Sequence, residues 1–235
     1  MRARVVALGV VAIALLGTGC AGEKDVVEQK TGNAASGSSA SSSAVPTKAS
    51  GSLVSSGFGQ KDGYVWVTSL VHNDSDKVGQ TVTVQFNAKD ATGKLVKSTS
   101  QVETFTRGNQ DIAVGTQIDV QKDVKIATVE ATLLIEDRGA FSREPFPEMP
   151  TTPVTVVADP YGGSTATFEL TNPTGQPVKS PRLGIICYDA ANTIIGGGVD
   201  FPELVPPSGK VAVEAHLLTS SVPATCRAFD GGPMF

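Results

Sequence analysis

The sequence predicts an all-β protein in which two antiparallel β-sandwiches follow a long segment without a folding pattern. Two observations support this fold class. From Leu53 onward polar and apolar residues alternate with period two, which is typical of strands with one buried face, and helical periodicity is almost absent. The second half of this region then repeats the apolar positions and turns of the first half, offset by 99 residues.

The first 19 residues have the order of a bacterial export signal. The basic residues Arg2 and Arg4 precede an apolar stretch from Val5 to Leu16, and small residues follow it. As a helix this stretch would be about 18 Å long, which is too short for a hydrocarbon core of about 30 Å. We therefore expect residues 1–19 to be a lipoprotein signal peptide rather than a lasting membrane helix.

Cys20 directly follows the small residues Gly17, Thr18 and Gly19. This arrangement predicts cleavage before Cys20 and attachment of lipid to its sulfur, although Gly17 stands where the bacterial lipobox usually has Leu. The alternative is an ordinary secretory signal cut nearby, which would leave an exposed thiol. The expected location is the outer face of the bacterial cytoplasmic membrane or an equivalent envelope leaflet, with the lipid as anchor.

Residues 20–52 are expected to form the lipidated end and a flexible tether. Ala34 to Ala44 contains only Ala, Ser and Gly, which cannot bury enough apolar area to fold. Such a tether would reach about 30 Å on average. Loss of the signal changes the formal net charge from −4 to −6, because it removes two Arg and no acid. An acidic chain disfavours nucleic acid as a partner.

The first sandwich is predicted over residues 53–136. Thr81 to Lys89 alternates without a break, so Val82, Phe86 and Ala88 should face a core. Turn-forming sequences such as Asp90-Ala91-Thr92-Gly93 separate the strands. Further strands are expected at Tyr64 to Val71, Leu95 to Val102, Ile112 to Ile118 and Ile126 to Ile135.

Four prolines, from Pro145 to Pro153, interrupt the pattern, so residues 137–153 are expected to be an extended connector. The second sandwich is then predicted over residues 154–235. The offset of 99 residues places Asn73 on Asn172 and Asp90 on Asp189 without a gap.

The repeat also bears on the cysteines. Cys187 falls on Ala88, and with a two-residue shift Cys226 falls on Val129, so both sites should be buried. Because an exported protein lies in an oxidising compartment, we expect a Cys187–Cys226 disulfide worth about 3–4 kcal/mol. The alternative is two buried free thiols.

Short motifs recur in both halves. They are Ser56-Gly57-Phe58-Gly59, Tyr64-Val65-Trp66-Val67, Asn73, Phe86-x-Ala88-x-Asp90-Ala91-x-Gly93, Asn172 and Ile185-Ile186-Cys187-Tyr188-Asp189-Ala190. Together these motifs resemble the FxLYD domain of bacterial envelope proteins. The first half has Ala88 and Lys89 where Leu and Tyr are expected, and the second half keeps the Tyr-Asp end but has Ile185 for Phe and Cys187 for Leu. The resemblance implies an immunoglobulin-like sandwich without a known enzymatic activity.

Motifs for catalysis, metals or cofactors are absent from the sequence. His72 and His216 are interpreted as ordinary polar strand positions, and Asp74 and Asp76 as a solvated turn rather than a calcium site. The glycines 196–198 suggest a bulge or a flexible hairpin tip.

Three functions therefore remain. The first is a non-catalytic interaction or scaffold module that binds an envelope protein or a wall polymer. The second is a carrier of an apolar ligand, and the third is an unrecognised envelope hydrolase. A lined apolar cavity would favour the carrier, clustered acids and His the hydrolase, and an exposed aromatic patch the module. Phe201 is an aromatic residue that fits either an exposed edge or a core.

Overall fold

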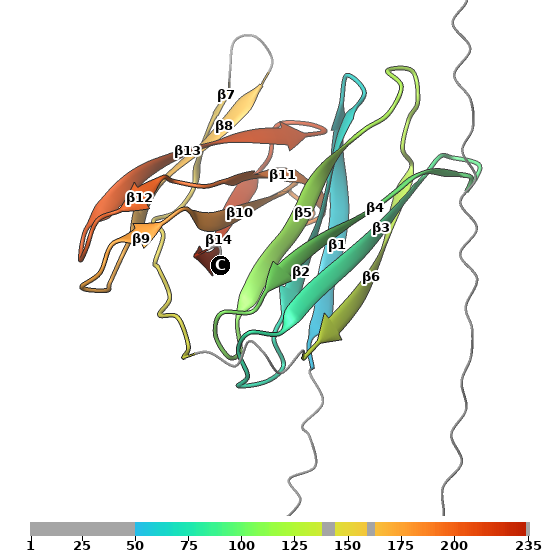
Figure 1. Cartoon of the computed structure of the whole chain (residues 1–235). Coiled ribbons are helices and arrows are strands. Elements are labelled where there is room, and N and C mark those ends of the chain that lie inside the picture. The colour runs from blue at the N-terminus through green and yellow to red at the C-terminus, as the bar shows by residue number, and fades with distance from the viewer. Residues whose placement is uncertain (1–49, 138–143, 159–162, 234–235) are drawn as a thin grey trace, which may run out of the picture. The chain divides into compact units, whose positions relative to one another are not determined.

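The computed structural model describes residues 50–137, 144–158 and 163–233 (Figure 1). Within these ranges all regular elements are β-strands, so the all-β prediction is confirmed. The described residues contain no helix long and apolar enough to cross a membrane. Cys20, the predicted signal peptide and nearly all of the predicted tether lie outside the described residues.

The first half of the fold consists of two three-stranded antiparallel sheets, with the orders β1-β2-β5 and β4-β3-β6 (Figure 1). Apolar residues from both sheets enclose one core, so this half is a sandwich. Its strands are β1 (Ser52–Lys61), β2 (Tyr64–His72), β3 (Thr81–Lys89), β4 (Leu95–Thr104), β5 (Asp111–Asp119) and β6 (Thr128–Glu136).

The second half repeats this arrangement. Its groups β7-β8-β13 and β11-β10-β14 correspond to the two sheets of the first half, and a short pairing between β11 and β13 joins them into one six-stranded sheet. A two-stranded pair, β9-β12, is added beside them. The strands are β7 (Thr155–Ala158), β8 (Ser164–Thr171), β9 (Val178–Lys179), β10 (Pro181–Tyr188), β11 (Ile194–Asp200), β12 (Leu204–Val205), β13 (Lys210–Thr219) and β14 (Thr225–Pro233).

Strand β3 shows how the sequence pattern produces the core of the first half. Val82, Val84, Phe86 and Ala88 are all essentially inaccessible to solvent, while the residues between them are partly exposed. This alternation confirms the inward positions that the sequence predicted for Val82, Phe86 and Ala88.

Two equivalent asparagines organise the same loop in each half. Asn73 and Asn172 are fully buried just after β2 and β8. The Asn73 amide donates to the carbonyls of Lys77 and Arg107, at 2.8 and 2.9 Å. The Asn172 amide donates in the same way to the carbonyl of Gln176, at 2.8 Å. Each Oδ1 accepts from the backbone amide two residues later, so both form an Asx turn.

The hairpin turns at Asp90 and Asp189 also match. Asp90 Oδ1 accepts from the amides of residues 92 and 94, and Asp189 Oδ1 accepts from those of residues 191 and 193. The left-handed position is Gly93 (φ 82°) in the first turn and Asn192 (φ 62°) in the second. These shared networks show that the offset of 99 residues relates equivalent structural positions.

The predicted disulfide is present. Cys187 on β10 and Cys226 on β14 lie directly opposite each other and are bonded. Ala88 and Val129 form the equivalent cross-strand pair in the first half. The disulfide therefore replaces an apolar contact between the same two strands of the repeated fold.

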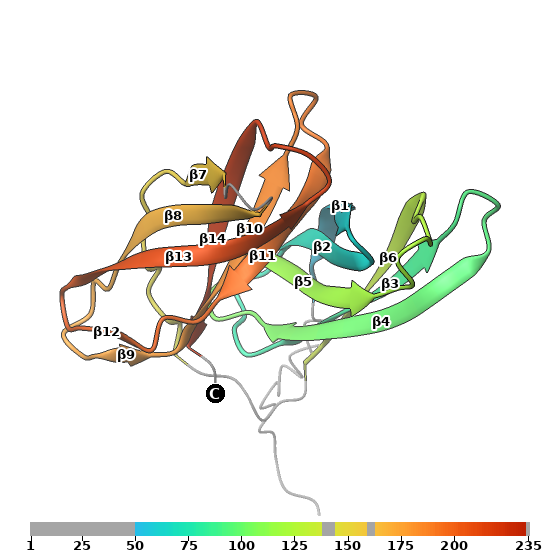
Figure 2. The ribbon, with the colours of Figure 1, turned by 90° about the horizontal axis from the view of Figure 1, so that it is seen from above.

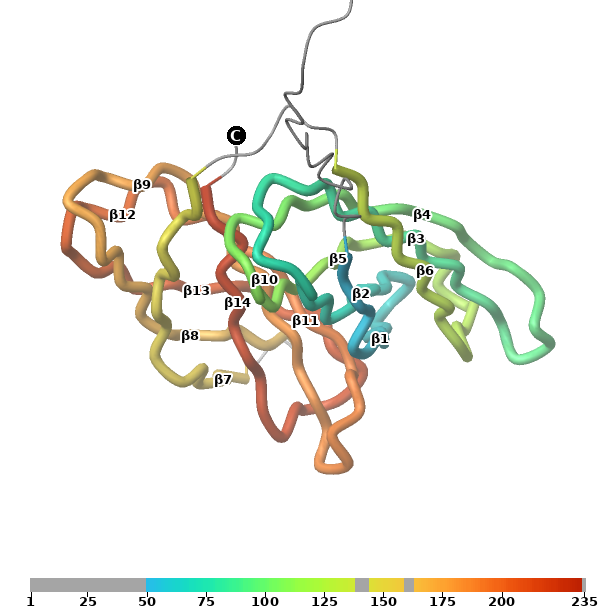
Figure 3. The backbone as a smooth tube through the Cα atoms, turned by 90° about the horizontal axis from the view of Figure 1, so that it is seen from below, coloured from blue at the N-terminus to red at the C-terminus, as the bar shows by residue number. Residues whose placement is uncertain are grey.

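The two halves pack against each other through sheet faces that would otherwise be exposed. Strand β1 lies against β11, and β5 lies against β10 and β14 (Figures 2 and 3). A separate apolar cluster fills this contact, and both halves belong to one compact unit. Its members are Leu70, Ala113, Ile186, Tyr188, Ile194 and Phe229.

Glycines allow the close approach of the strands around this contact. A Cβ atom on Gly197 of β11 would lie 2.0 Å from the Ile185 carbonyl oxygen and 3.2 Å from Nε1 of Trp66. Gly196 lies at an irregularity of the β10–β11 ladder, so the predicted bulge is correct. The predicted hairpin tip is wrong for residues 196–198, because they lie within β11 and the tip is the turn at Asp189.

Candidate functional site

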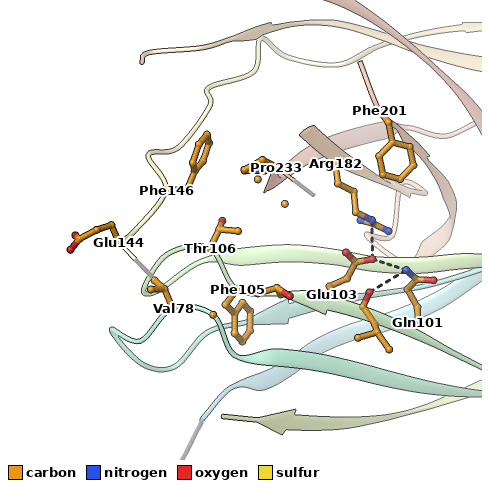
Figure 4. A pocket seen from close by; sticks show the side chains of 15 residues that line it. Val78, Gln101, Glu103, Phe105, Thr106, Glu144, Phe146, Arg182, Phe201 and Pro233 are labelled. Carbon is orange, nitrogen blue, oxygen red and sulfur yellow. Dashed lines mark hydrogen bonds and ion pairs between the residues drawn. The ribbon is translucent and has the colours of Figure 1, made fainter. Parts of the chain in front are cut away.

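A cleft of about 430 Å³ lies where the two halves meet (Figure 4). The end of β4 and the loop after it form one side of this junction cleft. The other side comes from the start of β10, the end of β14, the segment before β7 and the loop after β11. Its apolar lining residues are Val78, Val102, Phe105, Phe146, Phe201 and Pro233.

Two of these residues offer apolar surface to solvent. Phe201 is 41% exposed and Val102 is 53% exposed. Phe105, in contrast, is fully buried in the core of the first half, and Phe146 packs against the core of the second. The Phe146 amide donates to the Thr106 carbonyl at 2.8 Å, which holds the two walls together. The cleft therefore has walls that pack on the two cores and are joined by a backbone hydrogen bond, and it has a partly exposed apolar rim.

An ion pair between the halves lies in the cleft. Nε of Arg182 on β10 is 2.8 Å from Oε1 of Glu103 on β4. Their side chains are only 9% and 12% exposed. The Gln101 amide donates to the same oxygen at 2.8 Å. Figure 4 shows this group beside Phe201.

The guanidinium of Arg182 also bonds to the first half through backbone carbonyls. Nη1 donates to the Ala113 carbonyl at 2.9 Å, and Nη2 donates to that of Gly115 at 3.4 Å. Both acceptors lie on β5, the last strand of its sheet, so Arg182 satisfies carbonyls that no other strand of the described chain bonds. Arg182 from the second half thus bonds to both β4 and β5 and lies between these two edge strands of the first sandwich.

Burial governs the electrostatics of this pair. Desolvation raises the pKa of the Glu103 carboxyl, although Arg182 and the Gln101 hydrogen bond oppose this shift. Desolvation also lowers the pKa of Arg182, and here Glu103 opposes it. In both residues the cost of burying a charge exceeds the attraction of the partner.

A second hollow, of about 260 Å³, is polar and is centred on Asp230. The Asp230 side chain is 3% exposed and pairs with Arg107 Nη1 at 3.0 Å. It also accepts from the backbone amides of Met149 and Gly232, at 3.0 and 2.8 Å. Desolvation raises the pKa of Asp230, while the amides and Arg107 oppose the rise. Because Asp230 bonds to Arg107 of the first half and to Met149 of the connector, this group fixes the connector and the end of β14.

Phe201, which fitted either an exposed edge or a core from sequence, is partly exposed and lines the cleft, whereas the histidines and the Asp74–Asp76 turn do not line it. His72 Nδ1 is 2.8 Å from Oδ1 of Asp111, the first residue of β5, and His216 is exposed on β13. Asp74 accepts from the Ser52 hydroxyl in an exposed contact. No group of three metal-binding side chains occurs in the part of the chain that the structure describes.

Sequence reasoning missed Glu103 and Arg182, which are about 80 residues apart in the chain. A signal for Arg182 was present, because it is the one charged residue in the strand Pro181–Tyr188, every residue of which is buried. A charge in such a strand needs a partner, but the sequence does not indicate which acid supplies it.

Comparisons with known proteins add little to this description. No protein-family model and no curated protein matches the chain. Among solved structures, the chain is similar to red sea bream transglutaminase, with 14% sequence identity and a TM-score of 0.23. The match covers 75% of this chain and 29% of that one, so this chain spans less than a third of its length. A likeness this distant supports no inference about activity. The fold and the cleft define the protein as a tandem β-sandwich protein with an apolar cleft at the junction.

Proposed function

We propose that this protein is a non-catalytic interaction module held at the outer face of a bacterial membrane by lipid on Cys20. Its junction cleft binds a partner from the cell envelope, either a protein or a wall polymer. The observation that carries this proposal is the cleft itself, where the exposed rim formed by Phe201 and Val102 adjoins the ion pair that joins the two sandwiches.

The chemistry of the cleft supports binding rather than turnover. Glu103 is held by Arg182 and Gln101, and its carboxylate acts as part of the joint between the halves. The resemblance to the FxLYD domain, which has no known enzymatic activity, agrees with this view.

A carrier of an apolar ligand is the second candidate, and the size of the cleft favours it. A volume of about 430 Å³ falls within the range of roughly 300–1,000 Å³ that is usual for small-molecule sites. Mass spectrometry of organic extracts from the purified full-length protein tests this alternative. A single lipid or other apolar compound present in stoichiometric amount would favour the carrier over the interaction module.

The interaction module is tested with Phe201→Ala, because Phe201 is partly exposed and its loss leaves the cores intact. Val222→Ala is the matched control, since Val222 is 80% exposed and does not line the cleft. After crosslinking in native cells, Phe201→Ala should lose its crosslinked partners, whereas Val222→Ala should keep them. Identical crosslinking patterns for both variants would contradict binding in the cleft.

A further inference from the structure

Strand β4 is the outermost strand of its sheet, and its last residues form one wall of the junction cleft. It pairs with β3 on one side. On the other side, no strand within residues 50–137, 144–158 and 163–233 pairs with it. An unpaired edge of this kind offers backbone amides and carbonyls to another extended chain.

The backbone hydrogen bonds show which residues of β4 face outward. The Phe105 amide donates to the Gln80 carbonyl at 3.1 Å, so residue 105 directs its backbone groups toward the β3 side. In an antiparallel ladder this direction alternates from residue to residue. Thr104 and Val102 therefore direct their amides and carbonyls away from β3, toward the cleft. Within the described ranges, the contact to the Val102 carbonyl is a long one of 3.4 Å from the Gln101 side chain.

The protection typical of edge strands is uneven along β4. Lys94 and Lys97 lie at its start, and lysines discourage the pairing of strands between chains. From Ser98 to Thr104 there is neither Lys nor Pro. The one charge in this stretch, Glu103, is already engaged by Arg182. The unprotected part of the edge is thus the part that borders the cleft.

The charges of the cleft indicate which sequence would fit. Among the described residues that line the cleft, Glu103 and Glu144 are acidic and Arg182 alone is basic, so acidic groups are in excess in this set. The closest contacts of Glu103 fall on Oε1, and a carboxylate offers about four acceptor positions. A Lys or Arg of a partner could therefore bind beside it. Val102, on the opposite face of β4, offers an apolar neighbour for the next residue of the partner.

We propose that the cleft accepts an extended segment of a partner protein as a fourth strand of the sheet, paired with β4. The segment alternates apolar residues with at least one basic residue that faces Glu103. This inference rests on the proposed interaction function and names its occupant as a polypeptide strand. The main-chain bonds to β4 supply affinity, and the residues beside Val102 and Glu103 supply selectivity.

Synthetic peptides provide the test, with the full-length protein in detergent. The probe is an eight-residue peptide of alternating Val and Thr with one central Lys, and its control has Glu in place of Lys. The Lys peptide should bind about tenfold more tightly, the size of effect that one charged contact gives. Hydrogen exchange at the Val102 and Thr104 amides should slow on binding, because those amides become hydrogen-bonded.

Two further probes separate strand pairing from simple occupation of the cleft. N-methylation of the peptide amides that face β4 should abolish binding. N-methylation of the amides on the opposite edge of the peptide should leave binding intact. Val102→Pro removes an amide that faces away from β3, and Val102→Thr keeps that amide with a side chain of similar shape. Binding should weaken about tenfold or more in the Pro variant and stay near wild type in the Thr variant.

Several outcomes would overturn the strand-addition proposal. These are the absence of measurable binding by the Lys peptide, equal sensitivity to methylation on both edges, and unchanged binding by Val102→Pro. Slowed exchange at the Phe105 amide alone would also contradict it, because that amide already bonds to Gln80. If strand addition fails while Phe201→Ala still loses its crosslinked partner, the proposed function stands and only the nature of the occupant is wrong.

Discussion

Replacing Arg182 with Met should destabilise the fold strongly at neutral pH. The substitution keeps most of the apolar length of the side chain but removes its contacts with Glu103 and with the carbonyls of Ala113 and Gly115. Glu103 then remains as a buried carboxylate without its cation. Loss of one partner from a buried ion pair typically costs about 3–5 kcal/mol, and we expect a free-energy loss in this range.

The size of this loss should depend on pH. The folded-state pKa of Glu103 is raised above the ordinary value of 4.5. When the pKa of a carboxyl is higher in the folded than in the unfolded state, protonation favours the folded state. This contribution to the free energy of unfolding is fully present below the unfolded-state pKa and is lost as pH rises through the folded-state pKa. Removal of Arg182 takes away the attraction that opposes the rise, so the pKa of Glu103 should be higher still in the variant. The destabilisation should therefore be larger at pH 7 than at pH 4, where Glu103 is mostly protonated and the remaining loss comes from the hydrogen bonds to Ala113 and Gly115.

Urea unfolding followed by tryptophan fluorescence measures this effect. Trp66 is the only tryptophan in the sequence, and it lies beside Gly197 where the two halves meet. The double variant Arg182→Met with Glu103→Leu is the control, because it leaves no unpaired charge and should recover most of the lost stability. A loss at pH 7 below about 1 kcal/mol, or an equal loss at pH 4 and pH 7, would refute the reasoning.

Four more predictions concern the repeat, the junction, the disulfide and the anchor. Asn73→Ala and Asn172→Ala should each cost about 2–4 kcal/mol in urea unfolding, because each leaves buried backbone groups unpaired; a large effect in only one of them would argue against equivalent roles. Gly197→Ala should cost about 1–3 kcal/mol through overpacking and shift the Trp66 emission, while Gly175→Ala, which has open space around it, should change neither. Alkylation of the unreduced protein should leave Cys187 and Cys226 unmodified, and their replacement by Ala and Val should cost about 3–4 kcal/mol; labelling without reduction would show free thiols. Cys20→Ala should fail to incorporate labelled fatty acid, and equal labelling of variant and wild type would contradict lipidation.

The sequence was most informative where a single strand or turn determines the pattern. The alternation from Thr81 to Lys89 identifies β3 and its inward side chains, because only one face of that strand is buried. The offset that superposes Asn73 on Asn172 identifies equivalent loops, because a buried Asx turn requires the same side chain in both halves. The Cys187–Cys226 bond was expected from the oxidising compartment, with the repeat placing both cysteines at buried sites, and the structure contains that bond.

The contact between the halves was harder to predict, because it depends on which sheet faces meet. Strands β2 and β10 are buried on both faces, so their sequences do not alternate, and such apolar runs do not identify the neighbour that covers them. The triple glycine at 196–198 was interpreted as a local feature, although Gly197 is needed for close approach to Ile185 and Trp66. The cleft was missed for the same reason, since Glu103 and Arg182 meet only after the halves have packed.

Site-specific photo-crosslinking in native cells tests the central claim most directly. A photoreactive residue is placed at Phe201 or Val102 in the cleft, and at Val222 as an exposed position away from it, with the chain otherwise unchanged. The proposed function predicts a discrete adduct with an envelope partner from positions 201 and 102, none from position 222, and loss of the adducts in Cys20→Ala. Equal adducts from all three positions, or none from the cleft, would contradict binding of a partner at the junction.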